Sequence, residues 1–200
     1  ERRGVKINPK TFADLKRTLS EEHKKFEQEM YSIAGKEFNI GSPAQLSEVL
    51  FTDLALPTAG IKKGKTGYST GQAELDKLKG QHPIIELIEK TRELAKLMNT
   101  YVDTLPLLAD TRDRIHTTFN QDVAATGRLS STNPNLQNIP IRTEQGRKIR
   151  EAFITDGDKV LVSADYSQFE LRLAAILSND EKLINDFNGN VDIHTKTASE

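Results

Sequence analysis

The sequence predicts an α+β fold, with long amphipathic helices in its first half and short strands in its second. Apolar residues recur at helical spacing from Asn8 to about Ala34 and again from about Ile84 to Tyr101. Residues 114–120 alternate between apolar and polar side chains instead, which is typical of a half-buried strand. Residues 160–164 form a short, uncharged and β-branched run, which favours a buried strand.

The composition is that of an ordinary soluble protein. A chain of 200 residues can bury a sizeable core, and 36% hydrophobic with 28% charged residues suits such a core. The absence of cysteine excludes disulfides and thiolate metal sites and favours a reducing cytoplasm. No apolar run approaches membrane-spanning length, and the first residues carry neither an initiator methionine nor a signal-like segment. We expect a cytoplasmic protein with no membrane partner and, from its abrupt ends, a segment of a longer chain.

The net charge of −1 conceals a division along the chain. Residues 111–150 hold seven Lys or Arg against three acids, whereas residues 151–200 hold ten acids against four bases. A cationic stretch next to an acidic one suits a phosphate-binding surface beside a divalent-metal site. Two solvated faces of opposite sign explain the same counts, and charge alone favours that alternative.

The first helix has clear start and stop signals. Asn8 is placed to cap it, Pro9 fits the first helical position, and Gly35 ends it. Its apolar stripe is a core face and comprises Phe12, Leu15, Leu19, Phe26, Met30 and Ile33. The preceding residues 4–7 are either a short edge strand or an extended entry.

A second helix is predicted to begin at Ser42, with Gln45 placed to close a capping box. The following residues, 56–70, form a Gly- and Pro-containing loop made basic by Lys62, Lys63 and Lys65. A third helix is predicted from residues 68–70 to about 79. The lysines are either a solvated surface or, with Ser69, Thr70 and helix-end N–H groups, a site for a phosphate backbone.

The most polar stretch is residues 125–142, which contain few core-forming side chains and many amides and hydroxyls. It is either an ordinary Asn-rich loop or a surface whose amides contact base edges and sugar oxygens, with Arg128 and Arg142 reaching phosphate or the minor groove. His116, on the polar face of the strand before it, lacks a second ligand at a recognisable spacing and is interpreted as structural. Helices are also predicted over residues 180–187 and after Asp192.

The pattern of residues 160–177 predicts a short strand that ends at Asp165, followed by a helix that Ser167 caps. A carboxylate in that position can be a ligand for Mg²⁺, which one or two protein carboxylates plus substrate phosphates usually bind. It can equally be a turn former or a helix cap, and geometry alone favours this second interpretation.

Four stretches resemble the family A DNA polymerases. Asp165 to Arg172, DYSQFELR, resembles that family's first catalytic motif, whose usual form has Ile in place of Phe169. Residues 125–142 match its pattern almost throughout, with Asn133 where Asp is common. Residues 65–70, KTGYST, together with 94–97, LAKL, look like the family's thumb sequence.

The resemblance implies a helical thumb inserted into the start of an antiparallel-sheet palm. The implied domains are residues 1–40 as an N-terminal palm segment with its long helix, 41–104 as the thumb, and 105–200 as the palm up to the start of the fingers. It implies primer-template DNA as a partner. The implied DNA-binding residues are Lys62, Lys63, Lys65, Ser69, Thr70, Lys96, Arg128, Asn135, Gln137, Asn138 and Arg142.

The activity that the resemblance implies is attack of a primer 3′-hydroxyl on the α-phosphate of a deoxynucleoside triphosphate, with two Mg²⁺ ions about 4 Å apart and Mn²⁺ as a substitute. Asp165 and the carbonyl of Tyr166 would be the metal ligands. Glu170 would be catalytic as the residue that discriminates the sugar, and the nucleotide would also meet Tyr166, Ser167, Gln168 and His194. The segment would act as a monomer and, without the second catalytic carboxylate, would be inactive alone. The alternatives are a non-catalytic nucleic-acid-binding fragment and a relative of the single-subunit RNA polymerases, against which Glu170 and the 125–142 motif argue.

Overall fold

The computed structural model describes residues 1–65 and 67–199. The chain divides into two compact units, Glu1–Lys159 and Val160–Glu200, which we call the N-terminal and C-terminal units. Mixed helices and small antiparallel sheets confirm the predicted α+β class. The predicted domain boundaries after residues 40 and 104 stay predictions. No helix in the described part of the chain is both long and apolar enough to cross a membrane.

A small antiparallel sheet joins distant parts of the N-terminal unit. Strand β1 (Val5–Ile7) pairs on one side with β4 (Arg114–Ile115) and on the other with β7 (Phe153–Ile154). The prediction of an edge strand or an extended entry for residues 4–7 was therefore wrong, because β1 is the central strand. Both of its partners come from far along the sequence, where local patterns give no information about pairing.

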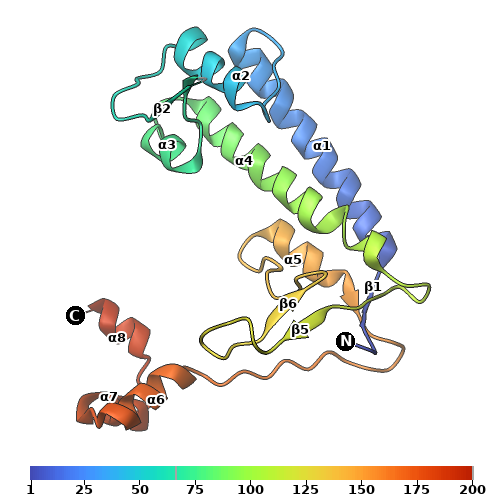
Figure 1. The fold of residues 1–200 in the computed structure, drawn as a ribbon, viewed down its shortest axis with the longest axis vertical. Helices are drawn as coiled ribbons and strands as arrows, with labels where there is room; N and C mark the ends of the chain where they lie inside the picture. The colour runs from blue at the N-terminus through green and yellow to red at the C-terminus, as the bar shows by residue number, and fades with distance from the viewer. Residues whose placement is uncertain (66, 200) are drawn as a thin grey trace. The chain divides into compact units, whose positions relative to one another are not determined.

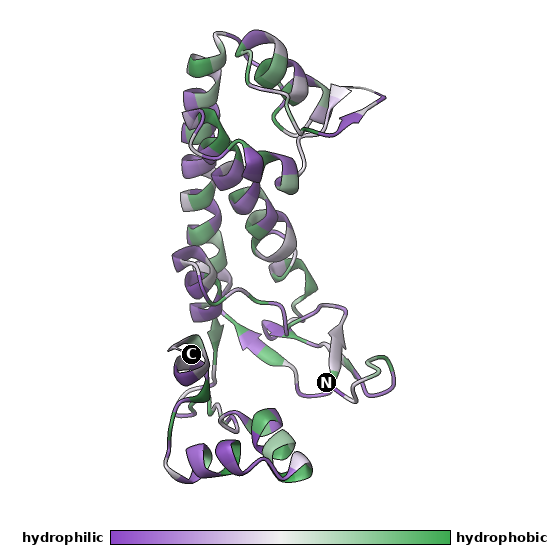
Figure 2. Cartoon of the chain, turned by 90° about the vertical axis from the view of Figure 1, so that its left-hand side faces the viewer, coloured by the Kyte–Doolittle hydropathy of each residue, from purple (hydrophilic) through white to green (hydrophobic). Residues whose placement is uncertain are grey.

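The long first helix follows its sequence signals. Helix α1 (Pro9–Ala34) begins after Asn8, whose side chain accepts hydrogen bonds from the N–H groups of Lys10 and Thr11. It ends at Gly35, whose φ of 68° lies in the left-handed region. Figure 2 shows hydrophobic and hydrophilic residues alternating along this helix. Four members of the predicted stripe are buried, and Phe26 and Ile33 pack against the core while partly exposed.

Helix α4 (Pro83–Leu97) runs antiparallel to α1 and packs along it (Figure 1). It continues into a π-helical turn, η2 (Met98–Val102), as the predicted helical range to Tyr101 implies. One core cluster lies where α1 and α4 meet α2 (Pro43–Glu48), η1 (Val49–Asp53) and α3 (Gln72–Lys77). A second lies where they meet the sheet and α5 (Glu144–Glu151), a helix capped by Thr143.

Two predictions for residues 42–79 were wrong in detail. Ser42 does cap α2, but the Gln45 side chain accepts a hydrogen bond from the N–H of Asn39, so no reciprocal capping box forms. The third helix begins at Gln72, because Tyr68 belongs instead to a hairpin of β2 (Lys63–Gly64) and β3 (Gly67–Tyr68). The N–H of Tyr68 donates to the hydroxyl of Ser47, and only glycine fits at Gly67, where a Cβ would lie 2.8 Å from that hydroxyl.

The predicted strand over residues 114–120 is two strands in two sheets. After β4 the chain turns at His116 and Thr117 and continues as β5 (Thr118–Asn120), which pairs with β6 (Ser130–Thr132). The Thr117 hydroxyl lies 2.6 Å from that of Ser131 and donates to the carbonyl of Pro134. Phe119 is exposed rather than buried, because β5 and β6 form a two-stranded pair that does not cover it. A short 3₁₀ turn, η3 (Pro106–Leu108), precedes β4.

The C-terminal unit consists of α6 (Phe169–Ser178), α7 (Glu181–Asn188) and α8 (Ile193–Ser199). The predicted strand over residues 160–164 was wrong, since this run has no strand conformation and its three largest side chains are 65–85% exposed. A strand needs a neighbour for its N–H and C=O groups, and no segment in the described chain pairs with this one. Ser167 is not the helix cap either: Gln168 stands there, with φ of 53° and no side-chain capping bond.

Candidate nucleic-acid interface and metal-binding motif

The basic hairpin lines a pocket of about 420 Å³ in the N-terminal unit. Three predicted DNA-binding residues, Lys62, Ser69 and Thr70, share this lining, while Lys63 and Lys65 lie exposed on the same hairpin. The Lys63 ammonium lies 5.3 Å from the centre of the Tyr68 ring. The lysines thus stand at an open surface, whereas Thr70 is 4% exposed and forms part of the pocket's base. Thr66 lies outside the described residues.

Arg92 on α4 holds Thr70, which follows this hairpin, in place. Its guanidinium donates to the carbonyl of Thr70 at 2.6 Å and to the Thr70 hydroxyl at 3.5 Å. Burial lowers the pKa of the Arg92 guanidinium, which remains charged because its ordinary pKa is so high. Arg92 therefore adds a positive charge to the pocket that Lys62 also lines.

A second groove, of about 510 Å³, connects α4 with the Asn-rich loop. Lys96 contributes from α4, and Asn138, Pro140 and Thr143 contribute from the loop. Buried Tyr101 fixes this contact, because its hydroxyl donates to the carbonyl of Asn138. Two predicted DNA-binding residues that are far apart in sequence, Lys96 and Asn138, thus line one groove.

The Asn-rich loop is anchored by its apolar residues and exposes its amides. Leu136 and Ile139 pack against the core cluster at the sheet, whereas Asn135, Gln137 and Asn138 are exposed. The Ser131 hydroxyl accepts a hydrogen bond from the N–H of Leu136 at 3.0 Å. The loop therefore exposes three amide side chains, while Leu136, Ile139 and the hydrogen bond to Ser131 hold its backbone against the core.

The two predicted arginines of this region are also at the surface. Arg128 follows Gly127, whose φ of 73° is left-handed, and both it and Arg142 are exposed. Exposed guanidinium and amide groups are of the kinds that can contact phosphates and base edges.

The residues of the predicted catalytic motif lie in the C-terminal unit. Asp165, Tyr166 and Ser167 are exposed, and the Asp165 carboxylate has no ion pair or hydrogen bond with any residue that the structure describes. Gln168 donates from its side chain to Asp192 at 3.1 Å, and the same Asp192 oxygen accepts from the N–H of His194. Two predicted nucleotide-binding residues, Gln168 and His194, therefore meet through Asp192.

Other contacts hold this motif in place. The pKa of Asp192 is lowered mainly by a hydrogen bond from the Thr195 hydroxyl and further by the N–H of His194 and by Gln168. Arg172 donates to the carbonyl of Ser167 at 3.1 Å, and its guanidinium lies 4.6 Å from the centre of the Phe187 ring. Glu170 lies in the first turn of α6 and is exposed.

The donor set at Asp165 fits a hard cation that takes only part of its coordination from protein. No group of three or more His, Cys, Asp or Glu side chains that could hold a metal occurs among the described residues. Mg²⁺ needs no such cage, since it usually keeps several waters and takes its remaining oxygens from one or two carboxylates and from substrate phosphates. An exposed carboxylate with no protein partner in the described chain is suited to that role.

Comparison with known proteins gives the family. The model of "DNA polymerase family A" matches residues 9–200. The chain belongs to DNA polymerase family A.

The family A chain is similar over its whole length to curated DNA polymerases. It is 50% identical to DNA polymerase I of Synechocystis over 99% of the chain and 20% of the relative. It is 51% identical to the thermostable DNA polymerase I of Thermus thermophilus over 100% of the chain and 24% of the relative. The chain thus spans a fifth to a quarter of these relatives.

A solved structure is similar as well. It is the POL domain of Pol1 from M. smegmatis in complex with DNA primer-template and dNTP, with a TM-score of 0.81 and 44% identity. The match covers 98% of this family A chain and 35% of that one.

Two residues of this family A chain that hold predicted site residues in place were not among those predicted from the sequence. Arg92 supports Thr70, and its signal was a charge at helical spacing from buried Ile84 and Ile88. Asp192 was predicted only to precede a helix, yet its carboxylate also joins Gln168 to His194. Nothing local to the sequence reveals that link, because Gln168 lies 24 residues earlier.

Proposed function

We propose that this chain is the thumb and first palm segment of a DNA-directed DNA polymerase that extends a primer by template-directed deoxynucleotidyl transfer. The observation that carries the proposal is the family match over residues 9–200, together with the exposed carboxylate of Asp165, which is unpaired within the described chain. The names of the relatives support DNA synthesis over a single-subunit RNA polymerase activity.

In this proposal the N-terminal unit holds primer-template DNA. The lysines of the hairpin and Lys96 bind the phosphate backbone. Asn135, Gln137 and Asn138 contact base edges and sugars, and Arg128 and Arg142 reach the minor groove or phosphates. The lysines, amides and arginines are all exposed, which supports the assignment. Ser69 and Thr70 are less exposed and line the hairpin pocket.

The C-terminal unit presents the catalytic motif. The Asp165 carboxylate and the Tyr166 carbonyl would hold Mg²⁺, or Mn²⁺ in its place. When bound, two such ions stabilise the attacking and leaving oxygens of phosphoryl transfer. Glu170 packs against the 2′ position of the incoming sugar and leaves no room for a hydroxyl, while Tyr166, Ser167, Gln168 and His194 bind the nucleotide.

The segment alone binds DNA without extending it, because the 200 residues offer one motif carboxylate where two ions must be held in register. In this proposal the isolated segment binds nucleic acid without catalysis, and the protein that contains it is the polymerase. We expect it to act as a monomer in the bacterial cytoplasm.

The deciding experiment is primer extension by the complete polymerase with Asp165→Ala. Loss of a metal ligand removes several kcal/mol of transition-state stabilisation, so we expect extension to fall by about three orders of magnitude or more. DNA affinity should be unchanged, because the phosphate contacts lie elsewhere. Asp158→Ala, also at an exposed acid, is the matched control and should extend normally. Normal extension by Asp165→Ala would refute the metal-ligand assignment.

Sugar discrimination tests Glu170 separately. Glu170→Ala should raise incorporation of ribonucleotides relative to deoxyribonucleotides, since the side chain that excludes the 2′-hydroxyl is shortened. Single-nucleotide incorporation with each sugar measures the ratio, and Glu181→Ala in the first turn of α7 is the control. An unchanged ratio would remove Glu170 from this role.

A further inference from the structure

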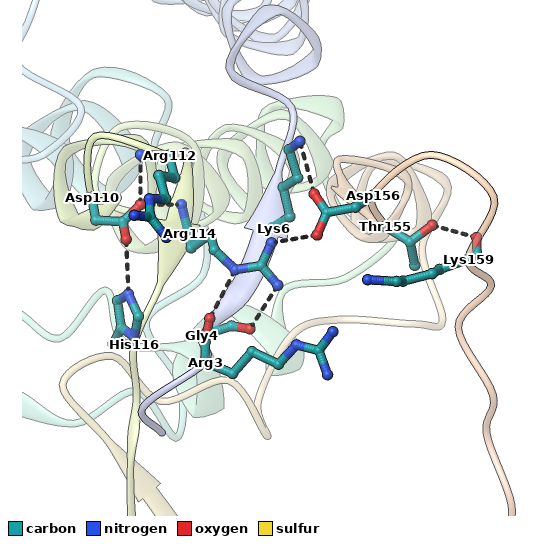
Figure 3. A network of polar contacts seen from close by, with 10 residues as sticks. All are labelled: Arg3, Gly4, Lys6, Asp110, Arg112, Arg114, His116, Thr155, Asp156 and Lys159. Carbon is teal, nitrogen blue, oxygen red and sulfur yellow. Dashed lines mark hydrogen bonds and ion pairs between the residues drawn. The ribbon is translucent and has the colours of Figure 1, made fainter.

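A cationic pocket of about 500 Å³ lies at the three-stranded sheet, apart from the hairpin pocket and the groove at Lys96. Figure 3 shows most of its side chains, which come from β1 and the residue before Gly4, from β4 and the turn before it, and from the segment after β7. The lining has five Lys or Arg residues, one His and two acids: Arg2, Arg3, Lys6, Arg112, Arg114, His116, Asp110 and Asp156.

Both acids of this pocket are fully engaged. Asp156 pairs with Lys6 and with Arg114, each at 3.0 Å. Asp110 lies 3.1 Å from the ring of His116 and accepts hydrogen bonds from the backbone N–H groups of Arg112 and Arg114. These contacts, chiefly the one from His116, lower the pKa of Asp110 to about 2. The two carboxylates are therefore ionised at neutral pH and are already committed to partners within the pocket.

Three guanidinium groups remain uncompensated. The side chains of Arg2, Arg3 and Arg112 make no ion pair or hydrogen bond with any residue in the described chain, although the backbone carbonyl of Arg3 accepts from Arg114. Five fixed positive charges against two negative ones leave a net charge of three at the pocket without counting His116. Such a concentration of one sign in a recess attracts an anion.

We propose that this pocket binds a phosphate group of a nucleic-acid backbone. Guanidinium groups bind phosphate through two parallel N–H···O bonds, and the pocket supplies three that are unused within the described chain. The chain links the pocket to the proposed DNA surface, because β4 leads through Thr117 into β5, and β5 pairs with the strand that enters the Asn-rich loop. The inference rests on the proposed DNA binding and adds a phosphate contact at residues outside those already proposed.

The test removes two unused guanidinium groups and leaves the paired ones intact. Arg3→Gln with Arg112→Gln, in the 200-residue chain, is compared with Arg17→Gln with Lys24→Gln, which removes two exposed charges from α1. Affinity for a labelled primer-template with a single-stranded overhang is measured by fluorescence anisotropy across a salt series. Far-ultraviolet circular dichroism and thermal midpoints establish that both variants fold.

We expect the pocket variant to bind DNA about tenfold more weakly at low salt. The slope of log affinity against log salt should become shallower by about 0.7 to 0.9 for each phosphate that the variant no longer neutralises. The α1 variant should keep the slope of the unmodified chain. An unchanged slope in the folded pocket variant would overturn the inference.

Two further arms identify the source of the anion. Inorganic phosphate and poly-glutamate are each titrated as competitors of the labelled DNA. We expect both to compete only weakly, since neither presents the successive phosphates of a nucleic-acid backbone. If the pocket variant loses affinity for phosphate or poly-glutamate but keeps its affinity for DNA, the pocket is a free-anion or acidic-protein site and the nucleic-acid assignment is wrong.

Arg142→Gln separates this inference from the proposed function. If Arg142→Gln weakens DNA binding and the pocket variant does not, the DNA surface stands and the pocket assignment falls. If the pocket variant alone weakens binding, the pocket stands and the contact assigned to Arg142 falls. If neither variant has an effect, both are wrong.

Discussion

The two units of the chain differ in how they use their apolar residues. The N-terminal unit buries them in two large clusters, in which Leu46, Ile84, Ile88 and Ile115 have no exposed surface. The C-terminal unit, as far as the structure describes it, buries only Ala175, Phe187 and Ile193, and the larger apolar residues that it exposes are Val160, Leu161, Val162, Tyr166, Phe169, Leu173, Ile176, Leu177 and Val191. The N-terminal unit therefore contains its own core, whereas the C-terminal unit has more apolar surface than its own elements can cover.

The difference shows that an apolar pattern predicts a face to be buried without supplying the partner that buries it. Helix α1 and residues 160–164 both carry apolar patterns typical of buried elements. Helix α1 meets α4 along its length, while residues 160–164 meet no described strand. Burial stabilises by roughly 25 cal/mol per Å² of apolar surface, so the stabilisation is absent wherever the covering element is absent.

The largest difference in stability should come from replacing one isoleucine by alanine in each unit and comparing the two variants. Ile88→Ala removes a fully buried side chain and should lower the free energy of unfolding by about 2–5 kcal/mol. Ile176→Ala removes the same atoms from a side chain that is 68% exposed and should change it by less than about 0.5 kcal/mol. Urea denaturation of both variants of the 200-residue chain measures the difference. Equal costs would show that the contrast between the units is false.

A smaller change in stability tests how the N-terminal unit holds the Asn-rich loop. Tyr101→Phe removes the hydroxyl that donates to the carbonyl of Asn138 and should cost about 0.5–1.5 kcal/mol. Hydrogen exchange at residues 135–139 should speed up, because the loop loses a fixed point. Tyr31→Phe is the control, since the Tyr31 hydroxyl makes no hydrogen bond to the described residues. Unchanged exchange in Tyr101→Phe would mean that packing of Leu136 and Ile139 alone positions the loop.

The smallest effect is a dependence of stability on pH that comes from His116 and Asp110 beside the sheet. The pKa of His116 is raised, mainly by its hydrogen bond to the Glu1 carbonyl and then by Asp110. A raised histidine pKa gives stability that is complete below the unfolded pKa of about 6.5 and is lost as pH rises through the folded value. The pKa of Asp110 is lowered to about 2, so its contribution is complete above about 3.9 and is lost as pH falls toward 2.

Denaturation midpoints of the unmodified chain and of His116→Gln, measured from pH 3 to pH 9, test this linkage. The unmodified chain should lose stability on the alkaline side, and His116→Gln should lack that loss. Both groups are partly exposed, which keeps the change small because solvent screens their interaction. A parallel alkaline loss in both proteins would assign the dependence to other groups.

Local signals in the sequence predicted the two long helices and the ends of the first one. Asn8, Pro9 and Gly35 define the ends of α1, because capping depends on a few adjacent residues. The sequence also singled out most of the candidate site, since the strings at 125–142 and 165–172 are distinctive in themselves. Arg92 and the second role of Asp192 were missed because their partners are 22 and 24 residues away.

The sequence by itself determined both ends of helix α1, the exposed polar loop and the membership of family A. Only the tertiary structure decided the strands. It made β1 central, divided residues 114–120 between two sheets, converted Tyr68 from a helix start to a hairpin strand, and left residues 160–164 without a partner in the described chain. The physical reason is that a helix satisfies its backbone hydrogen bonds within a few residues, whereas a strand exists only where another segment receives them.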